Sequence, residues 1–340
     1  MSSAGPSDSV VDLLVVGGGP TAIAIGAEAI KAGLSVKLIE KGALLASLLD
    51  FPTDMVFFTT RDLLEIAGIP FTIPESKPTR RQAIAYYHSV ARTFAIPLAL
   101  HQRVESIEGA VGGFTISARS GDETEIHQGR AVAVATGFFD GPRHLGTPGE
   151  DFDWVHHRYR EPYRHFGERV VVVGGGNSAV EAALDLWRSG AGVTLVHRGS
   201  ELKPSVKYWL KPDIENRIRE GAIEAHLDTR VASFGTHIVE VTQNGQRLDL
   251  PADAAYVLIG YEPDVSLHRA AGVELDSETL VPVFDPDSCE SNVAGLYIAG
   301  TLQAGRDTNR IFIENSRVHS VRIVQHLVRQ LAESGDRRGS

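Results

Sequence analysis

The chain has 340 residues, of which 43% are hydrophobic and 22% are charged, and its formal net charge is -10. This length predicts about two domains, each large enough to bury a core. The negative charge disfavours nucleic acid as a partner, because the phosphate backbone would be repelled. No apolar run reaches the roughly 18 residues that a membrane helix needs, so we expect no membrane partner either.

The segment MSSAGPSDSV at the N-terminus is polar and lacks the basic and apolar regions of a signal peptide. Cys289 is the only cysteine, which excludes an intrachain disulfide. We therefore expect a cytoplasmic protein.

An internal repeat organises the chain. Residues 17–42 read GGGPTAIAIGAEAIKAGLSVKLIEKG, and residues 174–199 align with them without a gap as GGGNSAVEAALDLWRSGAGVTLVHRG. The two copies lie too far apart in the sequence for a solenoid. They indicate one supersecondary unit that occurs once in each of two domains.

Each copy has the pattern of a βαβ unit. The apolar runs Val11–Val16 and Arg169–Val173 predict buried parallel strands. A glycine cluster follows, and then an alanine-rich helix that ends at a glycine. The runs Ser35–Ile39 and Val193–Val196 predict the second strands.

The remaining elements complete a two-domain α/β fold. The segment Pro78–Phe94 predicts an amphipathic helix with Thr79 as its N-cap, and Thr308–Leu331 predicts a long C-terminal helix. Gly141–Glu150 is rich in glycine and proline, which is typical of a linker. Further strands are expected at Phe114–Ala118, Arg130–Ala135, Ala255–Ile259 and Leu296–Ala299.

Apolar strand patterns like those of the first domain occur again after the second βαβ unit. We therefore expect two Rossmann-like, three-layer ββα dinucleotide-binding domains, the second inserted into the first. The first would comprise residues 1–147 and 256–340, and the second residues 148–255.

The two glycine loops are candidate phosphate sites. Gly17 and Gly174 permit the tight turn after the strand, and Gly19 and Gly176 let a pyrophosphate approach the backbone. The helix that follows offers free N–H groups and the positive end of its dipole. The candidate binding residues therefore also include Pro20, Thr21, Asn177 and Ser178.

The copies differ at the end of their second strands. Glu40 aligns with His197, and Lys41 aligns with Arg198. A carboxylate accepts hydrogen bonds from ribose hydroxyls and repels a 2′-phosphate, whereas His197 and Arg198 would attract that phosphate. Because a flavin needs enclosure by the larger, split domain, we expect FAD in the first domain and NADPH in the second. We assign no metal ligands from the sequence.

Segments outside the repeat carry a family resemblance. The architecture resembles the low-molecular-weight thioredoxin reductase class of flavoproteins, including the connector Ala135-Thr136-Gly137. Within that class the chain resembles the YpdA family of bacillithiol disulfide reductases. The segments that carry this resemblance are FPTDMVFFTT (51–60), IAGIPF (66–71), KPTRRQAIAYY (77–87), GLYIAGT (295–301) and RIFIENSRVHS (310–320).

The resemblance implies roles for particular residues. It places Pro52, Thr53 and Phe57 near the isoalloxazine, with Thr21 as a further flavin-proximal candidate. It also implies flavin contacts from the connector and from the C-terminal segment. These contacts would come from Thr136, Gly137, Gly300, Thr301 and Ile311, although thioredoxin reductases have an aspartate where Thr301 stands.

Two departures from the resembled families bear on mechanism. The chain lacks the CxxC dithiol of thioredoxin reductases, which excludes dithiol exchange of that kind. The YpdA pattern has a cysteine at the position of Thr21, and a hydroxyl cannot form a mixed disulfide. Thr21 is better suited to a hydrogen bond with cofactor phosphates. Cys289 lies among acidic residues that disfavour a thiolate.

We therefore expect an NADPH-dependent flavoprotein reductase of a small acceptor. The family resemblance implies that this acceptor is bacillithiol disulfide and that the reductase forms a homo-oligomer. Bacillithiol is anionic, and Arg306 and Arg310 are candidates for a basic pocket. Glu314 and His319 could form a proton relay on the last helix, or simply part of its surface.

Three other functions stay open. One is electron transfer to a small redox protein, as in ferredoxin–NADP reductases, which also lack CxxC. Another is flavin monooxygenation, since FDWVHHRYREP (152–162) resembles part of that group's linker motif but lacks its glycine. The last is a non-catalytic, redox-sensing nucleotide binder, which Thr21 keeps possible.

Overall fold

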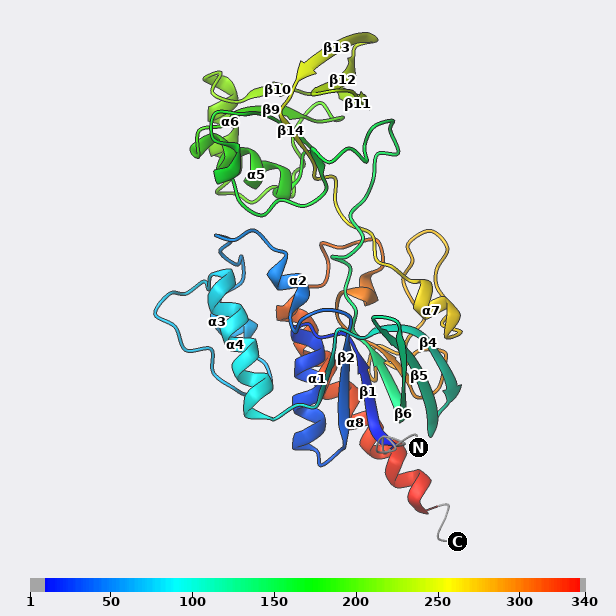
Figure 1. Cartoon of the computed structure of the whole chain (residues 1–340). Helices are drawn as coiled ribbons and strands as arrows, with labels where there is room; N and C mark the ends of the chain where they lie inside the picture. The colour runs from blue at the N-terminus through cyan, green and yellow to red at the C-terminus, as the bar shows by residue number, and fades with distance from the viewer. Residues whose placement is uncertain (1–9, 337–340) are drawn as a thin grey trace. The chain divides into compact units, whose positions relative to one another are not determined.

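The computed structural model describes residues 10–336, so most of the polar N-terminal segment lies outside the described residues. The chain divides into two compact units (Figure 1). The first unit comprises Met1–Leu49, Met55–Asp140 and Glu262–Ser340. The second comprises Asp50–Asp54 and Gly141–Tyr261.

The first unit is built on a seven-stranded sheet with the order β3-β2-β1-β6-β5-β4, in which β15 also pairs with β6. Its centre is parallel, because β1 pairs in parallel with both β2 and β6. The edge is an antiparallel meander of β4, β5 and β6. The strands are β1 (Val11–Val16), β2 (Val36–Glu40), β3 (Leu98–Leu100), β4 (Arg103–Ala110), β5 (Gly113–Ser120), β6 (Glu123–Val134) and β15 (Leu296–Ile298).

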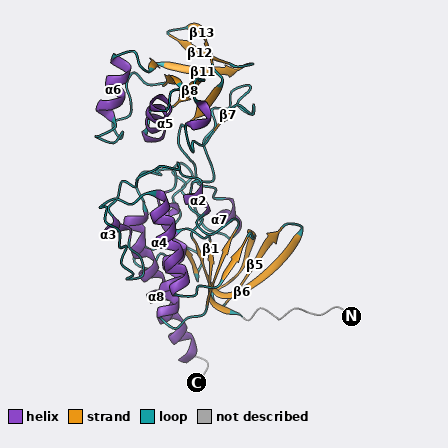
Figure 2. Cartoon of the chain, turned by 60° about the vertical axis from the view of Figure 1, so that its left-hand side comes forward, coloured by secondary structure: helices purple, strands orange, loops and turns teal. Residues whose placement is uncertain are grey.

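Helices complete the first unit (Figure 2). The glycine loop after β1 leads into α1 (Pro20–Lys31), which packs against both α4 (Arg80–Thr93) and α8 (Ile313–Asp336). Leu14 and Val16, which alternate along β1, belong to an apolar cluster that does not include α1. Residues of β4, β5 and the surroundings of α7 (Ser266–Ala270) are also part of this cluster. The shorter helices are α2 (Ala46–Leu49), α3 (Arg61–Leu64) and η2 (Gly300–Ala304).

The start of α4 shows how local sequence sets an element. Thr79 is the N-cap, and its hydroxyl accepts a hydrogen bond from the backbone N–H of Gln82 at 3.3 Å. The Gln82 side chain in turn accepts one from the Thr79 N–H at 2.8 Å. This reciprocal capping box satisfies two N–H groups that the first turn leaves free. The predicted N-cap is confirmed.

The second unit has three layers. A five-stranded sheet, ordered β10-β9-β8-β14-β7, is parallel throughout. One apolar cluster joins it to α5 (Asn177–Arg188) and α6 (Lys211–Arg219), and another joins it to a three-stranded antiparallel sheet. The strands are β7 (Val155–His156), β8 (Arg169–Val173), β9 (Gly192–Val196), β10 (Glu224–His226), β11 (Thr229–Phe234), β12 (Ile238–Gln243), β13 (Gln246–Pro251) and β14 (Ala254–Val257).

The structure corrects three expected boundaries. The predicted domain boundary after residue 255 would cut β14, which pairs with β8 inside the second unit, so the unit extends to Tyr261. At the other junction the second unit begins at Gly141 rather than residue 148, and it includes Asp50–Asp54. The C-terminal helix begins at Ile313 rather than Thr308, because η2 and a turn occupy the preceding residues.

Each helix in the described part of the chain is too short or too polar to traverse a lipid bilayer.

Candidate functional site

The first glycine loop joins β1 to α1 and fits closely against the end of β6. Gly17 has a φ of 121°, which disfavours any residue with a side chain. A Cβ atom there would lie 2.5 Å from the carbonyl oxygen of Ala135. Glycine is therefore required for this turn, as the sequence predicts.

The absence of a side chain at Gly18 leaves room for Glu40, the acidic residue at the end of β2. A Cβ atom on Gly18 would lie 2.8 Å from Cγ of Glu40. The Glu40 side chain is buried, and its Oε1 accepts a hydrogen bond from the Gly42 N–H at 2.8 Å. Burial raises the pKa of Glu40, and the N–H donors of Gly42 and Gly18 oppose that rise. Sequence reasoning did not single out Gly18, although the middle glycine is present in both copies.

Gly19 leaves the N-terminus of α1 open. It is the N-cap and makes no side-chain cap hydrogen bond. A Cβ atom there would meet no atom within 4 Å. The first N–H groups of α1 thus face space into which a phosphate could come without a clash.

The second loop, between β8 and α5, repeats this geometry. Gly174 has a φ of 148°, and a Cβ atom there would lie 2.4 Å from the carbonyl oxygen of Leu258. A Cβ atom on Gly175 would lie 2.5 Å from the ring of His197. Gly176 is the uncapped N-cap of α5 and would meet only the Lys203 side chain, at 3.8 Å. In each loop the middle glycine packs against the side chain that distinguishes the copies.

Basic groups surround the second loop. His197 is buried, and burial lowers its pKa, with the charges of Lys203 and Arg198 acting in the same direction. Arg198 is exposed, and the Lys203 N–H donates to the carbonyl oxygen of Gly175 at 2.9 Å. Lys203 was missed by sequence reasoning, because it lies in a loop outside the repeat.

Comparisons with known proteins agree with this geometry. Residues 14–300 match the family described as pyridine nucleotide-disulphide oxidoreductase. The chain belongs to this family. It is therefore a flavoprotein reductase that uses a flavin and a nicotinamide nucleotide.

Individual relatives narrow the likeness. The chain is 34% identical to bacilliredoxin reductase Bdr of Bacillus subtilis, over 93% of this chain and 97% of that protein. The solved structure of bacillithiol disulfide reductase Bdr (YpdA) from Bacillus cereus superposes with a TM-score of 0.92 at 35% identity, covering 95% of this chain and 100% of the other. Thioredoxin reductase of T. acidophilum shares the fold, with a TM-score of 0.75 at 20% identity. The match covers 96% of this chain and 100% of the other. The resemblance to the YpdA family is confirmed.

Thr21, where the resemblance implies a cysteine, faces the C-terminal part of the first unit. Its hydroxyl lies 3.2 Å from the hydroxyl of Ser316 on α8. A Cβ atom on Gly300 would lie 3.2 Å from Thr21 Oγ1. The start of α1 is therefore next to the segment for which the resemblance implies flavin contacts.

The other first-unit candidates are distributed around the same end of the sheet. Thr136 follows Ala135 directly below the Gly17 turn, and a Cβ atom on Gly137 would lie 3.8 Å from Thr301 Oγ1. The Lys41 ammonium forms an ion pair with Asp140 at 2.5 Å. Ile311 is half-buried in the turn before α8.

The candidates before α3 fall into different units. Pro52 and Thr53 belong to the second unit, where the Thr53 N–H donates to the carbonyl oxygen of Arg160 at 2.8 Å. Phe57 belongs to the first unit, is buried, and donates its N–H to the carbonyl oxygen of Pro78 at 2.9 Å. Their placement near the isoalloxazine stays a prediction from the resemblance.

Two further candidates in the second loop make internal contacts. The Asn177 side chain accepts a hydrogen bond from the Lys207 N–H at 2.8 Å and donates one to the carbonyl oxygen of Ser205 at 3.0 Å. It thereby ties the loop after β9 to the start of α5. Ser178 is exposed beside it.

The two residues on α8 that were considered for a proton relay have different hydrogen-bond partners. Glu314 accepts a hydrogen bond from the hydroxyl of Thr59. His319 is buried, and its Nδ1 accepts a hydrogen bond from the Gly300 N–H at 3.1 Å. The two side chains therefore have separate partners. Burial lowers the pKa of His319 to about 4, so the imidazole is neutral at pH 7.

Among the cysteine and arginines named from the sequence, Cys289 is buried and Arg306 is paired, whereas Arg310 is exposed. Cys289 is fully buried, and burial raises the pKa of its thiol. Arg306 forms an ion pair with Glu262 at 2.9 Å and donates a hydrogen bond to the carbonyl oxygen of Glu278. Arg310 is exposed.

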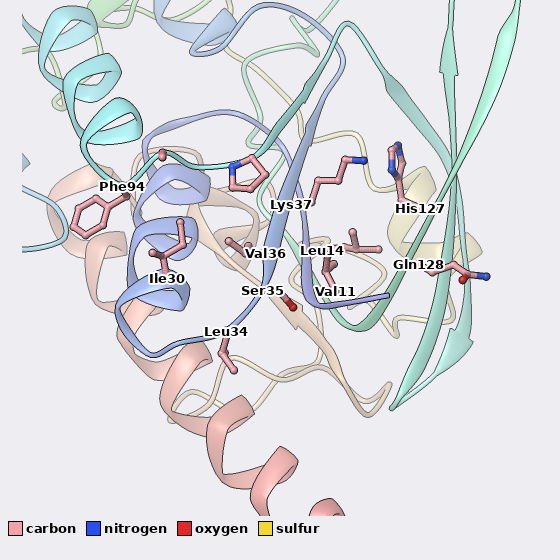
Figure 3. A pocket seen from close by; sticks show the side chains of 12 residues that line it. Val11, Leu14, Ile30, Leu34, Ser35, Val36, Lys37, Phe94, His127 and Gln128 are labelled. Carbon is pink, nitrogen blue, oxygen red and sulfur yellow. The ribbon is translucent and has the colours of Figure 1, made fainter. Parts of the chain in front are cut away.

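A pocket of about 530 Å³ lies at the opposite end of the first unit's sheet (Figure 3). Its walls include Val11, the first residue of β1, whereas the glycine loop follows the last residue of that strand. Its other labelled residues come from β1, from the end of α1 and the loop after it, from β2, from the C-cap of α4 and from the antiparallel meander. The pocket is thus separate from the first glycine loop.

Proposed function

We propose that the first unit binds FAD, that the second binds NADPH, and that electrons pass from NADPH through the flavin to a low-molecular-weight disulfide. The observation that carries this proposal is the contrast between two loops of the same backbone geometry. One holds a carboxylate, Glu40, against its middle glycine, and the other holds the imidazole of His197 in that place.

The first loop fits an adenosine diphosphate group that has free ribose hydroxyls. The open N-cap at Gly19 offers N–H donors to the pyrophosphate. Glu40 is held by the Gly42 N–H, which leaves other lone pairs to accept from the ribose. Its negative charge would repel a 2′-phosphate, which supports FAD rather than NADPH at this loop.

The second loop fits a nucleotide with an additional phosphate. Gly176 provides the corresponding open N-cap. The exposed guanidinium of Arg198 can bind a 2′-phosphate with paired N–H donors, and Lys203 adds a second positive charge beside His197. A carboxylate in place of His197 would favour NADH instead.

The balanced reaction converts one disulfide, one NADPH and one proton into two thiols and NADP⁺. Bound flavin supplies the two-electron chemistry, while the protein binds and orients both nucleotides. Thr21 cannot form a mixed disulfide, and Cys289 is buried. The proposed reaction therefore involves no covalent intermediate between the substrate and this chain.

We propose bacillithiol disulfide as the acceptor, because the matching Bacillus cereus structure is named a bacillithiol disulfide reductase. Bacilliredoxin is the matched alternative, because the Bacillus subtilis relative is named for it. The two differ in size, so they require different access to the flavin.

An anaerobic stopped-flow experiment tests the proposal. The purified, full-length flavoprotein is reduced with NADPH and mixed in turn with bacillithiol disulfide, oxidised bacilliredoxin, ferredoxin and a quinone. We expect flavin reoxidation to be fastest with bacillithiol disulfide. Faster reoxidation by ferredoxin or quinone would contradict the acceptor, and protein that cannot be loaded with FAD would contradict the whole scheme.

We also propose a homo-oligomer. The helix α8 exposes apolar side chains at Val318, Val321 and Val328, of which 44%, 41% and 39% of the surface is accessible. Exposed apolar side chains along one element are typical of a subunit contact. Size-exclusion chromatography with light scattering tests this, and a monomer at micromolar concentration would contradict it.

A further inference from the structure

Three side chains that commonly bind metals converge in the second unit, away from its glycine loop. They are His144 and Glu150, which precede β7, and His157, which follows its last residue. One ligand atom from each lies within 4.8 Å of the others. The two imidazole rings are 4.2 Å apart between centroids. Sequence reasoning assigned no metal ligands, because no motif spacing marks these residues.

The distances fit a tetrahedral ion. His144 Nδ1 lies 3.7 Å from Glu150 Oε1, and His157 Nε2 lies 3.9 Å from the same oxygen. Zinc bonds of about 2.0–2.2 Å in tetrahedral geometry place ligand atoms roughly 3.3–3.5 Å apart. Each imidazole thus needs to approach the carboxylate by only a few tenths of an ångström, and the ligand atoms of the two imidazoles lie within 4.8 Å of each other. Two imidazoles with one carboxylate also favour zinc, which commonly binds imidazole nitrogen. Magnesium and calcium prefer oxygen ligands.

The carboxylate is held in place before any ion binds. Glu150 is only 7% exposed. Its Oε1 accepts from the Leu145 N–H at 2.8 Å, and its Oε2 accepts from the N–H groups of Gly146 and Thr147 at 2.7 and 3.3 Å. Such outer contacts orient a ligand and reduce the entropy lost on binding.

Two residues that line the neighbouring hollow carry unsatisfied polar atoms. His157 Nδ1 and Thr147 Oγ1 are buried and have no hydrogen-bond partner. Both residues line a cavity of about 600 Å³, together with the acidic side chains of Asp151 and Asp153. Buried polar atoms are nearly always paired, so two unpaired ones beside a potential ligand set indicate a site for a polar guest.

We propose that His144, Glu150 and His157 bind one zinc-class divalent cation, with a fourth position for water. The ion would tie the segment before β7 to the residue that follows it. Because β7 is a short edge strand that, among the described residues, pairs only with β14, this link would hold the edge of the parallel sheet in place. This role does not depend on the proposed redox function.

Zinc titration of the flavin-loaded, full-length chain tests the proposal. The protein is freed of any affinity tag, treated with a chelator, dialysed and titrated with zinc sulfate by calorimetry. We expect one zinc per chain. His144→Ala and His157→Ala should each weaken binding by at least about tenfold, the lower end of what losing even an outer-shell partner costs. Cobalt bound to the parent protein should give the visible absorption bands of tetrahedral coordination, at longer wavelengths than the flavin bands. The variant that carries both His144→Ala and His157→Ala should show no such bands.

The matched control is His88→Ala, which removes an exposed histidine on α4 in the first unit and should leave zinc binding unchanged. His144 is 61% exposed, so its truncation is a variant that keeps the fold even if His157→Ala unfolds. Absence of stoichiometric zinc binding to the parent protein would overturn the proposal. Equal binding by His144→Ala and His88→Ala would overturn it as well.

Discussion

Thr21 on α1 and Ser316 on α8 face each other with their hydroxyl oxygens 3.2 Å apart. Thr21, where the resemblance to the YpdA family implies a cysteine, is therefore part of a contact between two helices. With Cys289 buried, the described residues expose no thiol.

Thr21→Cys should introduce a reactive thiol at this contact. The loss of the hydroxyl pair should cost about 1 kcal/mol of unfolding free energy. In a native titration with an aromatic disulfide reagent, the parent protein should show no fast-reacting thiol and the variant should show one. Disulfide reductase activity should become sensitive to alkylation only in the variant. Rapid native labelling of the parent at Cys289 would contradict this.

Substitutions of the third glycine in each loop should affect the binding of different nucleotides. Gly19→Ala places a methyl group where no protein atom lies within 4 Å, so the chain should fold while phosphate approach is blocked. We expect protein with normal circular dichroism that has lost most of its flavin absorbance.

Gly176→Ala is the matched change in the second loop, where only Lys203 is near. This variant should remain yellow and show a KM for NADPH raised by about tenfold or more, the cost of losing contacts to a charged group. Flavin loss in Gly176→Ala together with retention in Gly19→Ala would reverse the assignment of the units.

Arg198→Ala should change the choice of coenzyme. Removing a hydrogen bond to a charged phosphate costs about 1.5–3 kcal/mol, so the KM for NADPH should rise roughly 10- to 100-fold. The KM for NADH should stay within about twofold, because NADH lacks the 2′-phosphate. Arg247→Ala, at an exposed position on β13, is the control. Steady-state kinetics that show equal effects on both coenzymes would remove the 2′-phosphate argument.

His268 should make the protein less stable in mild acid. Its ring is 2% exposed with neither nitrogen bonded, and burial lowers its pKa to about 4. Between that value and the unfolded value of 6.5, the unfolded chain binds a proton that the folded chain does not. Stability therefore falls as the pH decreases through this range, by about 2 kcal/mol at pH 5 from this residue.

His268→Leu removes that proton. We expect its melting temperature to exceed that of the parent by more at pH 5 than at pH 7.5, as measured by circular dichroism. An equal difference between parent and variant at the two pH values would show that His268 is protonated in the folded protein.

Local sequence determined much of this protein. The buried apolar runs of β1 and β8, the glycines that follow them and the Thr79 cap depend on residues close together in the chain, so their patterns could be interpreted directly. The contrast between Glu40 and His197 was visible because the repeat aligns them. The family resemblance came from contiguous segments in the same way.

Tertiary structure decided what distant residues do to one another. Ala254–Val257 joined the sheet of β8 because hydrogen bonding between strands, which composition does not encode, selects the neighbour. Gly18 and Gly175 acquired a role only when folding packed the side chains of Glu40 and His197 against them. The convergence of His144 with His157 likewise required the chain to turn back around Glu150, since side-chain proximity depends on the path of the backbone rather than on residue type.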